Sequence, residues 1–579
     1  MTAPRPTCLP GRTKVSNAPE GARPRRFSRF GNDRATPSAE NHTFQAPARE
    51  RLHELPHNGA VLTDSSSAWP SRSPSRSDCA AKASSGSFGF SFFRSALGQY
   101  PGKIDLHQLG SGANGHFFFA HTRPESDALT NPSGTATITG TWTLDRPLHQ
   151  WGRVFVHMPD HGAWTQQAQY TIDLGNGTKK TRAALQRNYA NTWVSLGVFD
   201  FAGTPKVSLS NVTHDGDGVD DIAWDAIAIQ PLAAKPKDIV VAMGDSFSSG
   251  EGASDFDGAQ YYRATDNNGL WENPGVGRIN EETAKNRFRN ACHRSTEAWS
   301  RKAVLDTSPG ATIGARADSY AADLDYHLIA CSGAESRHLL PFYSVGPDKP
   351  SAAEQQGTRG RFRELSQLDQ GYVDENTTLV TVSIGGNDAR FADILRTCVT
   401  HPQPNACQMQ TLERDVQAAP AATAQRINTS MKASVITVLE QIRHKAPSAK
   451  ILLMGYPMLF ENYDGCAVVN ETEKSWLNET AKLLNARLKD AAAAVTTATA
   501  PVVFGDPTIQ FAGRNLCSTP NAINRLVINR SPGDDPVLVP RLPGPDLPLG
   551  VSQQSFHPNR LGTTLYAQVM QAALKSVYQ

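Results

Sequence analysis

The chain has 579 residues, which exceeds what one hydrophobic core normally holds, so two or three folded units are expected. A hydrophobic content of 39% is typical of globular proteins, and a formal charge of +2 gives no general attraction to nucleic acid or to a membrane surface. No apolar run is long enough to cross a bilayer, so a transmembrane segment is not expected.

Residues 1–85 are rich in Arg, Pro, Ser and Ala and show little periodic apolar patterning. Such a composition cannot bury enough apolar surface to offset the entropy lost on ordering, so this leader is predicted to be disordered. Its first 30 residues contain no apolar core of a signal peptide.

Residues 86–235 contain short alternating stretches separated by turn residues, among them "ATITGTWTL", "GRVFVHMP" and "TWVSLGVFDF". A hairpin is predicted around Gly175-Asn176-Gly177. Strands at this spacing favour an all-β sandwich.

Three stretches of this region, "AQYTI", "NTWVSLGVFDF" and "DGDGVDDIAWDAIAI", resemble the golvesin-type, carbohydrate-binding-like sandwiches attached to secreted hydrolases. The resemblance implies contact with carbohydrate or a cell surface. The neighbouring "HDGDGVDD" has the acidic look of a calcium loop but lacks the spacing and distal Glu of an EF-hand, which favours a solvated turn.

After a short linker, "AAKPK", residues 236–579 alternate between near-continuous apolar strands and helical patterns. This alternation predicts an α/β fold with a parallel sheet covered on both faces. Ser246, Gly333 and Asn387 each come just after a predicted strand. Loops at the carboxyl ends of parallel strands form the ligand crevice of such sheets, so one crevice is expected to hold all three.

Four stretches occur in order: "GDSFSSGEG" with Ser246, "ACSGAES" with Gly333, "SIGGNDARF" with Asn387 and "SFHPNRLG" with His557. Together they resemble the SGNH, or GDSL-type, serine hydrolase superfamily, in its branch of secreted, disulfide-containing bacterial lipases and esterases. The resemblance implies a flavodoxin-like, three-layer α/β/α hydrolase domain. The Gly-x-Ser-x-Gly elbow of the α/β-hydrolases is absent around Ser246.

A serine hydroxyl needs an adjacent base to act as a nucleophile, and His557 is the candidate for Ser246. Attack on an ester places negative charge on the carbonyl oxygen, which preorganised donors must stabilise. The resemblance assigns this oxyanion hole to the backbone N–H groups of Ser246 and Gly333 and to the side-chain amide of Asn387. Asp245 is expected to hold the nucleophile loop.

Many members of this superfamily carry Asp three residues before the catalytic His, but this chain has Gln554 there. Some secreted members instead orient the imidazole with a main-chain carbonyl two residues before it, which here belongs to Ser555. We favour this arrangement over a distant carboxylate, because a carbonyl can hold the Nδ1–H tautomer.

Six of the eight cysteines form an even set without a CxxC pair, at Cys292, Cys331, Cys398, Cys407, Cys466 and Cys517. This favours disulfides and therefore export to an oxidising compartment, over a cytosolic protein with free thiols. The resemblance implies the pairs Cys292–Cys331, Cys398–Cys407 and Cys466–Cys517. Cys8 and Cys79 have no evident role.

The sequence therefore predicts a carboxylic ester hydrolase that uses no metal and no organic cofactor. Phospholipase and polysaccharide O-deacetylase activities remain alternatives, because members of the superfamily share these four stretches. A protein of another class, which binds carbohydrate or a surface through an inactive hydrolase-like unit, is disfavoured by the intact Ser246 and His557.

Overall fold

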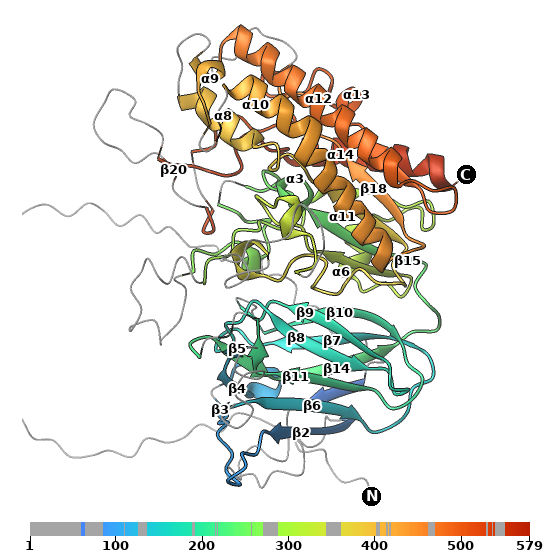
Figure 1. The fold of residues 1–579 in the computed structure, drawn as a ribbon. Helices are drawn as coiled ribbons and strands as arrows, with labels where there is room; N and C mark the ends of the chain where they lie inside the picture. Colours follow the sequence, from blue (N-terminus) through green and yellow to red (C-terminus); the bar gives the residue numbers. More distant parts are fainter. Residues whose placement is uncertain are drawn as a thin grey trace, which may run out of the picture. The chain divides into compact units, whose positions relative to one another are not determined.

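The computed structural model describes part of the chain. The described residues are 60–63, 85–108, 110–124, 136–187, 191–214, 216, 218–255, 257–269, 288–342, 360–400, 406–412, 415, 418–460, 469–528, 531–534, 537–538 and 550–578. Within them, the region of short strands and the region of alternating strands and helices each form the predicted type of fold (Figure 1).

The first region consists of antiparallel sheets. One sheet has the order β1 (Ala60–Thr63), β14 (Ala226–Pro231), β7 (Trp151–Met158) and β10 (Thr192–Asp200). The other has the order β2 (Gly86–Phe92), β6 (Ile138–Leu144), β11 (Lys206–Ser210), β8 (Ala168–Asp173) and β9 (Lys179–Ala184). Apolar residues of both sheets share one core, among them Trp142, Val156 and Leu209. This shared core is that of a sandwich.

The remaining strands here are β3 (Asp105–His107), β4 (Phe117–His121), β5 (Arg123–Pro124), β12 (Val212–Thr213) and β13 (Asp221–Trp224). The predicted hairpin is present, because β8 and β9 pair in antiparallel fashion across Gly175-Asn176-Gly177. Asp221 of the predicted acidic turn pairs with Nδ1 of His121 at 2.7 Å, whereas Asp215 and Asp217 lie outside the described residues.

One part of the leader prediction was wrong. Ala60–Thr63, within the segment expected to be disordered, forms β1 and pairs with Ala226–Ile229 of β14. The short apolar sequence Ala-Val-Leu adds a strand to the open edge of β14. The sequence did not predict this strand, because four residues are too few to show the alternation of apolar and polar residues that indicates a strand. The other residues up to 84 lie outside the described residues.

The second region is built on a five-stranded parallel sheet. Its order is β16 (Leu324–Leu328), β15 (Asp238–Gly244), β17 (Leu379–Ser383), β18 (Lys450–Met454) and β19 (Val502–Gly505). All four pairings are parallel. This is the flavodoxin-like order 2-1-3-4-5, in which the first strand lies between the second and third.

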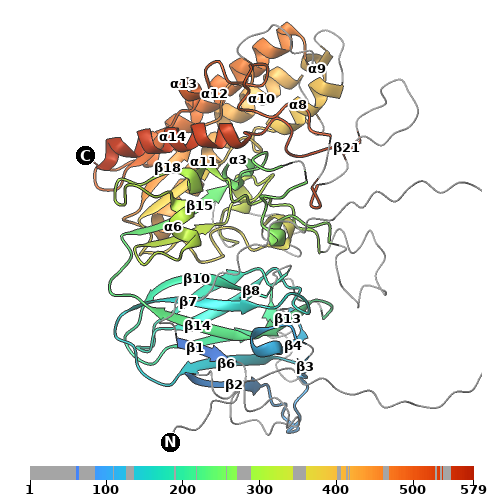
Figure 2. The same cartoon turned by 180° about the vertical axis from the view of Figure 1, so that it is seen from behind.

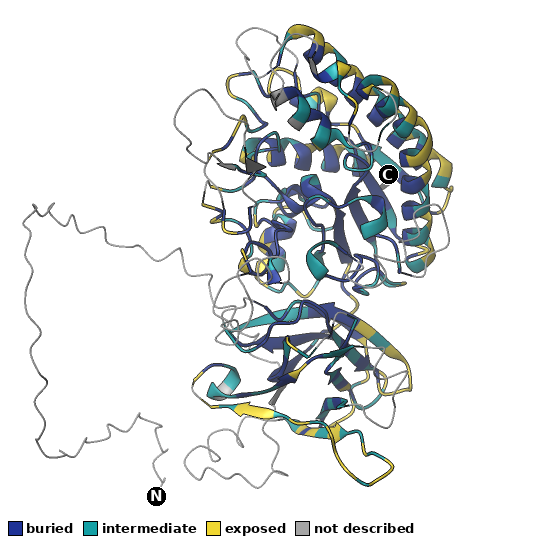
Figure 3. Ribbon diagram, turned by 60° about the vertical axis from the view of Figure 1, so that its left-hand side comes forward, coloured by how far each residue is buried: buried dark blue, intermediate teal, exposed yellow. Residues whose placement is uncertain are grey.

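Helices cover both faces of this sheet (Figure 2). Val241 and Val382 pack with α11 (Lys432–Lys445) and α12 (Glu471–Val495), whereas Val240 and Leu379 pack with α5 (Trp299–Lys302) and α14 (Arg560–Tyr578). Successive residues of a strand point to opposite faces, so strands buried on both faces must be apolar throughout. Every residue of β15 and β17 is buried, and the central strands accordingly appear dark blue in Figure 3.

The other helices of this region are short or flank the sheet. They are α3 (Ser246–Ser249), α6 (Ile313–Asp318), α8 (Phe391–Thr400), α9 (Ala406–Met409), α10 (Ala419–Arg426) and α13 (Thr508–Phe511). A π-helical stretch, Ile427–Met431, joins α10 to α11, and a two-stranded ribbon pairs β20 (Val537–Leu538) with β21 (Gly550–Val551). Helix α12 begins at a capping box of Asn470 and Glu473.

Candidate active site

Ser246 is the first residue after the buried strand β15 and its Asp245 cap. The side chain of Asp245 accepts a hydrogen bond from the backbone N–H of Phe247 at 3.1 Å, which starts α3 at Ser246. Gly250 ends this single turn in the left-handed conformation, with φ of 88°. The short turn leaves Ser246 at the carboxyl edge of the sheet, where its Oγ lies 2.8 Å from Nε2 of His557.

His557 lies in the loop that leads into α14. Its Nδ1 is 3.0 Å from the backbone carbonyl oxygen of Ser555. The side chain of Gln554, at the position where many relatives carry Asp, instead donates to the carbonyl of Asp255 at 3.2 Å. Asn524 holds the loop through two backbone hydrogen bonds, of 2.8 Å from its N–H to His557 and of 3.0 Å from the N–H of Phe556.

The electrostatics of His557 favour the neutral imidazole. Burial lowers its pKa below the ordinary value, while the carboxylate of Glu251 and the backbone carbonyls of Ser555 and Gln553 act in the opposite direction. A neutral ring with Nδ1–H held by a carbonyl presents a lone pair on Nε2 toward Ser246. This is the protonation state that a general base requires.

Gly333 and Asn387 lie at the same edge of the sheet as Ser246. All three, together with His557, line one cavity of about 330 Å³. Gly333 has φ of 72°, and a Cβ there would lie 3.0 Å from the guanidinium of Arg361, so glycine suits this position. The side-chain amide of Asn387 donates to the carbonyl of Ala334 at 2.9 Å, which holds it beside the Gly333 loop.

A buried hydrogen-bond network connects the Ser246 loop to the Asn387 loop. Asp245 accepts from Ser383 Oγ at 2.6 Å and from the hydroxyl of Tyr456 at 2.5 Å. The Tyr456 hydroxyl in turn accepts from the backbone N–H of Gly386 at 3.0 Å. Burial raises the pKa of Asp245 to about 6, against the hydrogen bonds of Ser383 and Tyr456. Asp245 therefore positions both loops, because the N–H of Phe247, Ser383 and Tyr456 all donate to its carboxylate.

The rest of the cavity wall is mainly apolar. Its apolar residues include Phe391, Ala392 and Leu395 of α8, Pro457 and Leu459 after β18, and Ala481 and Leu484 of α12, and the polar residues Arg361, Ser552 and Gln553 also line it. An apolar cavity of this size with a few convergent polar groups is typical of a site for a small organic ligand.

A second buried polar cluster lies behind the His557 loop. Nδ1 of His293 is 2.6 Å from Glu251, and its Nε2 is 3.3 Å from Asp266. Burial opposes a charge on His293, but the two carboxylates outweigh it and raise its pKa to about 10. Asp534 lies close enough that Glu251, His293 and Asp534 could be taken for metal ligands. Both ring nitrogens of His293 face carboxylates, however, so an imidazolium already satisfies this cluster and leaves no lone pair for a metal.

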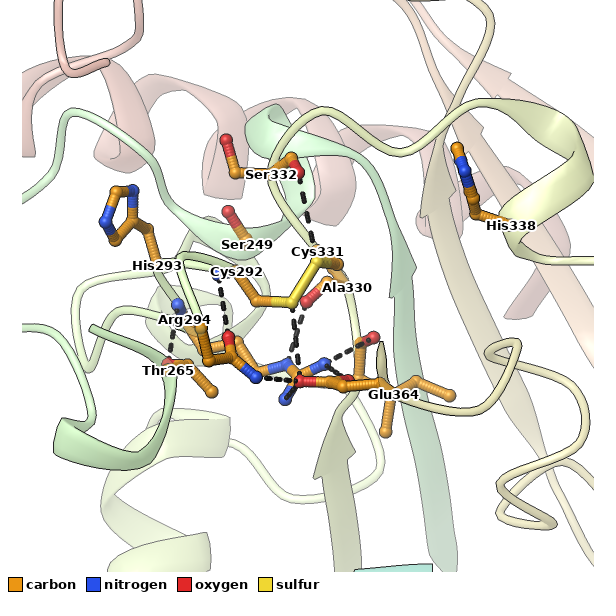
Figure 4. The surroundings of a disulfide bond; sticks show 12 residues. Ser249, Thr265, Cys292, His293, Arg294, Ala330, Cys331, Ser332, His338 and Glu364 are labelled. Atoms are coloured by element: carbon orange, nitrogen blue, oxygen red, sulfur yellow. Dashed lines mark hydrogen bonds and ion pairs between the residues drawn. A yellow bond between two sulfur atoms is a disulfide. The ribbon is translucent and has the colours of Figure 1, made fainter. Parts of the chain in front are cut away.

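Two disulfides join segments near the cavity of Ser246 and His557. Cys292 is bonded to Cys331, and Cys398 is bonded to Cys407. Figure 4 shows the first bond, with His293 following Cys292 and Ser332 following Cys331, so it joins the buried cluster to the Gly333 loop. Cys517 is also disulfide-bonded, but Cys466, its predicted partner, lies outside the described residues.

An ion pair lies beneath the Cys292–Cys331 bond. Arg294 contacts Glu364 at 2.5 Å and also donates to the carbonyl oxygens of Ile329 and Ala330 (Figure 4). These contacts join the segment after β16 to two distant parts of the chain.

The sequence patterns missed several of these residues. Glu251 lies inside the "GDSFSSGEG" stretch and His293 follows a predicted disulfide cysteine, but neither position carries a spacing that indicates an ion pair. Tyr456 follows the strand β18 in "MGYP". It lies far from Asp245 along the chain, so the sequence gives no sign that the two residues are in contact. Only the folded arrangement brings them together.

Residues 240–569 match the GDSL-like lipase/acylhydrolase model, and residues 120–231 match that of the Golvesin C-terminal domain. Lipase 1 of Streptomyces coelicolor is 27% identical over 294 residues, which is 51% of this chain and 77% of the relative. A lipase of Streptomyces rimosus is 26% identical over 279 residues, which is 48% of this chain and 73% of the relative.

Among solved structures, the extracellular lipase of Streptomyces rimosus aligns over 58% of this chain and 98% of its own, with 24% identity and a TM-score of 0.37. In the part of the chain that the structure describes, no helix combines the length and apolar character needed to cross a bilayer. The match to the GDSL-like lipase/acylhydrolase model, over residues 240–569, contains Ser246, Gly333, Asn387 and His557.

Proposed function

Because the chain belongs to the GDSL-like lipase/acylhydrolase family, we propose that it hydrolyses carboxylic esters through an acyl-enzyme on Ser246. The observation that carries this proposal is the 2.8 Å contact between Ser246 Oγ and His557 Nε2. The ring of His557 is oriented to accept the Ser246 proton, because the Ser555 carbonyl lies 3.0 Å from Nδ1 and favours the tautomer with a lone pair on Nε2.

In the proposed first half-reaction, Ser246 Oγ attacks the ester carbonyl carbon while His557 Nε2 takes the hydroxyl proton. The carbonyl oxygen becomes an oxyanion, which the backbone N–H groups of Ser246 and Gly333 and the amide of Asn387 stabilise. Collapse breaks the bond to the leaving alcohol, and His557 returns the proton to the alcohol oxygen. A water then attacks the acyl-enzyme by the same steps and releases the carboxylic acid.

The apolar wall supports an acyl chain longer than acetyl as the group that the cavity holds. Leu395, Leu459 and Leu484 offer surface that acetyl would leave uncovered. This favours a lipase or esterase over a polysaccharide O-deacetylase, and the two related proteins are themselves named lipases. The disulfides support export to an oxidising compartment as the setting of this activity.

The test is hydrolysis of p-nitrophenyl acetate and p-nitrophenyl octanoate by the wild type and by Ser246→Ala. We expect kcat of the variant to fall by a factor of about 10³ or more on both esters, because the remaining groups cannot form an acyl-enzyme. Ser300→Ala, at a buried position of α5 that does not line the cavity, is a control for the loss of a buried hydroxyl. Equal rates for the wild type and Ser246→Ala would reject the proposal.

A further inference from the structure

The proposed reaction raises the question of which group stabilises the positive charge on His557. When it takes the Ser246 proton, the ring becomes an imidazolium, which an adjacent carboxylate stabilises in most serine hydrolases. Its Nδ1 lies 3.0 Å from the carbonyl oxygen of Ser555, and the carbonyl of Gln553 also acts on the ring, but both groups are neutral dipoles. Either this chain does without carboxylate charge, or the charge comes from another part of the fold.

Glu251 lies in the segment that packs against His557. Its neighbour Gly252 has φ of 86°, and a Cβ at residue 252 would lie 2.8 Å from Cβ of His557 and 2.9 Å from Nδ2 of Asn524. The backbone after α3 therefore runs directly against the histidine loop. Asn524 fixes this packing by donating from its side chain to the carbonyl of Gly252 at 2.9 Å.

The Glu251 carboxylate is completely buried and fully engaged. One oxygen lies 2.6 Å from Nδ1 of His293, and the other accepts from the hydroxyl of Tyr261 at 3.3 Å. The side chain of Ser332, next to Gly333, also helps to lower the pKa of this carboxyl group. Burial opposes ionisation, but the attraction of His293 outweighs it and holds the pKa of Glu251 below the ordinary value.

The charges of this cluster do not cancel. His293 carries one positive charge against the carboxylates of Glu251 and Asp266, and the carboxyl group of Asp534 also belongs to the cluster, so at least one negative charge is in excess. Buried charges act over longer distances than exposed ones, because little water screens them. The excess charge therefore adds a negative potential at His557, and the carboxylate raises the pKa of His557 against the effect of burial.

We propose that Glu251, held by His293, is a positioning residue that supplies the negative potential for the His557 imidazolium in place of a carboxylate on Nδ1. This inference rests on the proposed function of Ser246 and His557. The same carboxylate also connects three segments of the chain. Ser332 relates it to the Gly333 loop, Gly252 to the loop of His557, and His293 to the segment of the Cys292–Cys331 disulfide.

Other charged groups surround His557 and must be separated from Glu251 in any test. Behind Glu251 lie His293, Asp266 and Asp534, at the cavity side lie Asp245 and Arg361, and near the surface lies the ion pair of Asp255 and Arg560. The experiment therefore changes one charge at a time and measures kcat/KM against pH, whose acid limb follows the ionisation of the base in the free enzyme.

The main variant is Glu251→Gln, which keeps the shape and removes the charge. We expect the acid limb of kcat/KM to move to lower pH by about half a unit or more, and kcat at the plateau to fall roughly tenfold. Glu251→Asp, which keeps the charge, should restore the position of the acid limb. An acid limb of Glu251→Gln that coincides with that of the wild type would overturn the inference.

The matched control is Asp238→Asn. Asp238 forms an equally buried ion pair with Arg316 at 2.8 Å, but at the opposite end of β15 from Ser246. Its loss should lower the melting temperature and leave the acid limb in place. If Glu251→Gln behaves as Asp238→Asn does, with lower stability and an unmoved limb, Glu251 is merely structural.

A second variant covers the case in which Glu251→Gln does not fold. His293→Gln removes the cation that holds Glu251 ionised against burial, so the carboxyl group should take up a proton and the acid limb should move to lower pH, in the same direction as in Glu251→Gln. A shift to higher pH, or none, would contradict the inference. Ser246→Ala separates the two proposals: if it retains wild-type activity, the proposed function fails, whereas the inference about Glu251 is judged only from activity that depends on Ser246.

Discussion

The carboxylate of Asp245 and the hydroxyl of Tyr456 form a buried hydrogen bond of 2.5 Å between residues 211 positions apart in the chain. Tyr456 follows β18, whereas Asp245 follows β15, and β17 lies between these two strands. The bond therefore passes over the end of β17, where the Gly385-Gly386-Asn387 turn begins. It joins the loop of Ser246, the proposed nucleophile, to the loop of Asn387, a proposed oxyanion donor.

Tyr456→Phe tests this tie. The variant keeps the ring but removes the donor to Asp245 and the acceptor for the N–H of Gly386. We expect kcat to fall about tenfold or more with a smaller change in KM, because loss of a hydrogen bond to a charged group costs about 1.5–3 kcal/mol. Tyr326→Phe, which loses one hydrogen bond to Ser300 elsewhere in the fold, is the control. Similar kinetics for the two variants would show that the tie has no part in catalysis.

Asn387→Ala removes one expected oxyanion donor. Steady-state hydrolysis of p-nitrophenyl octanoate should show kcat lower by about 10²–10³, because the lost donor acts mainly in the transition state. KM should change little. Asn428→Ala, on the exposed side of the π-helical stretch, should retain wild-type rates. A fall of less than threefold in Asn387→Ala would remove this residue from the oxyanion hole.

Ala481→Leu tests the apolar wall as the acyl site. Ala481 is a buried residue of α12 that lines the cavity, so the larger side chain should occupy space that a long acyl chain needs. We expect the ratio of kcat/KM for octanoate to that for acetate to fall about tenfold, since each buried methylene contributes about 0.8 kcal/mol. Ala494→Leu, on the exposed side of the same helix, should leave the ratio unchanged. An unchanged ratio in Ala481→Leu would place the acyl chain elsewhere.

The stability of the fold should depend on pH through His293. Its pKa is about 10 in the folded protein and 6.5 in an unfolded chain, so its contribution is complete below pH 6.5 and is lost as pH rises toward 10. Between these values the free energy of unfolding should fall by up to about 1.4 kcal/mol per pH unit from this group. Urea denaturation at pH 7, 8 and 9 measures this slope.

His293→Gln should be less stable than the wild type at pH 7 by about 3–5 kcal/mol, because one partner of a buried ion pair is removed. It should also lose the additional slope between pH 7 and 9. His444→Gln, at an exposed position of α11, should keep both the stability and the slope of the wild type. A wild-type slope in His293→Gln would mean that His293 is not charged in the fold.

Much of the architecture followed from local patterns. Near-continuous apolar strands such as Ile239–Met243 can be stable only when both faces are covered, which predicted the parallel sheet and its helices. The Gly-Asn-Gly turn predicted the hairpin of β8 and β9. The strand β1 was missed, because its four residues are too few to set a period and its partner β14 lies far along the chain.

For the candidate site, the sequence by itself predicted Ser246, Gly333, Asn387 and His557, because four short stretches in order resemble those of one hydrolase superfamily. Only the tertiary structure decided which groups surround them. The Tyr456 hydroxyl and the Glu251–His293 pair make contacts of a few ångströms between segments that are distant in the chain, whereas the Ser555 carbonyl, two residues from His557, was already predicted from the sequence. Hydrogen bonds and buried charges depend on separation in space, and a linear sequence records only separation along the backbone.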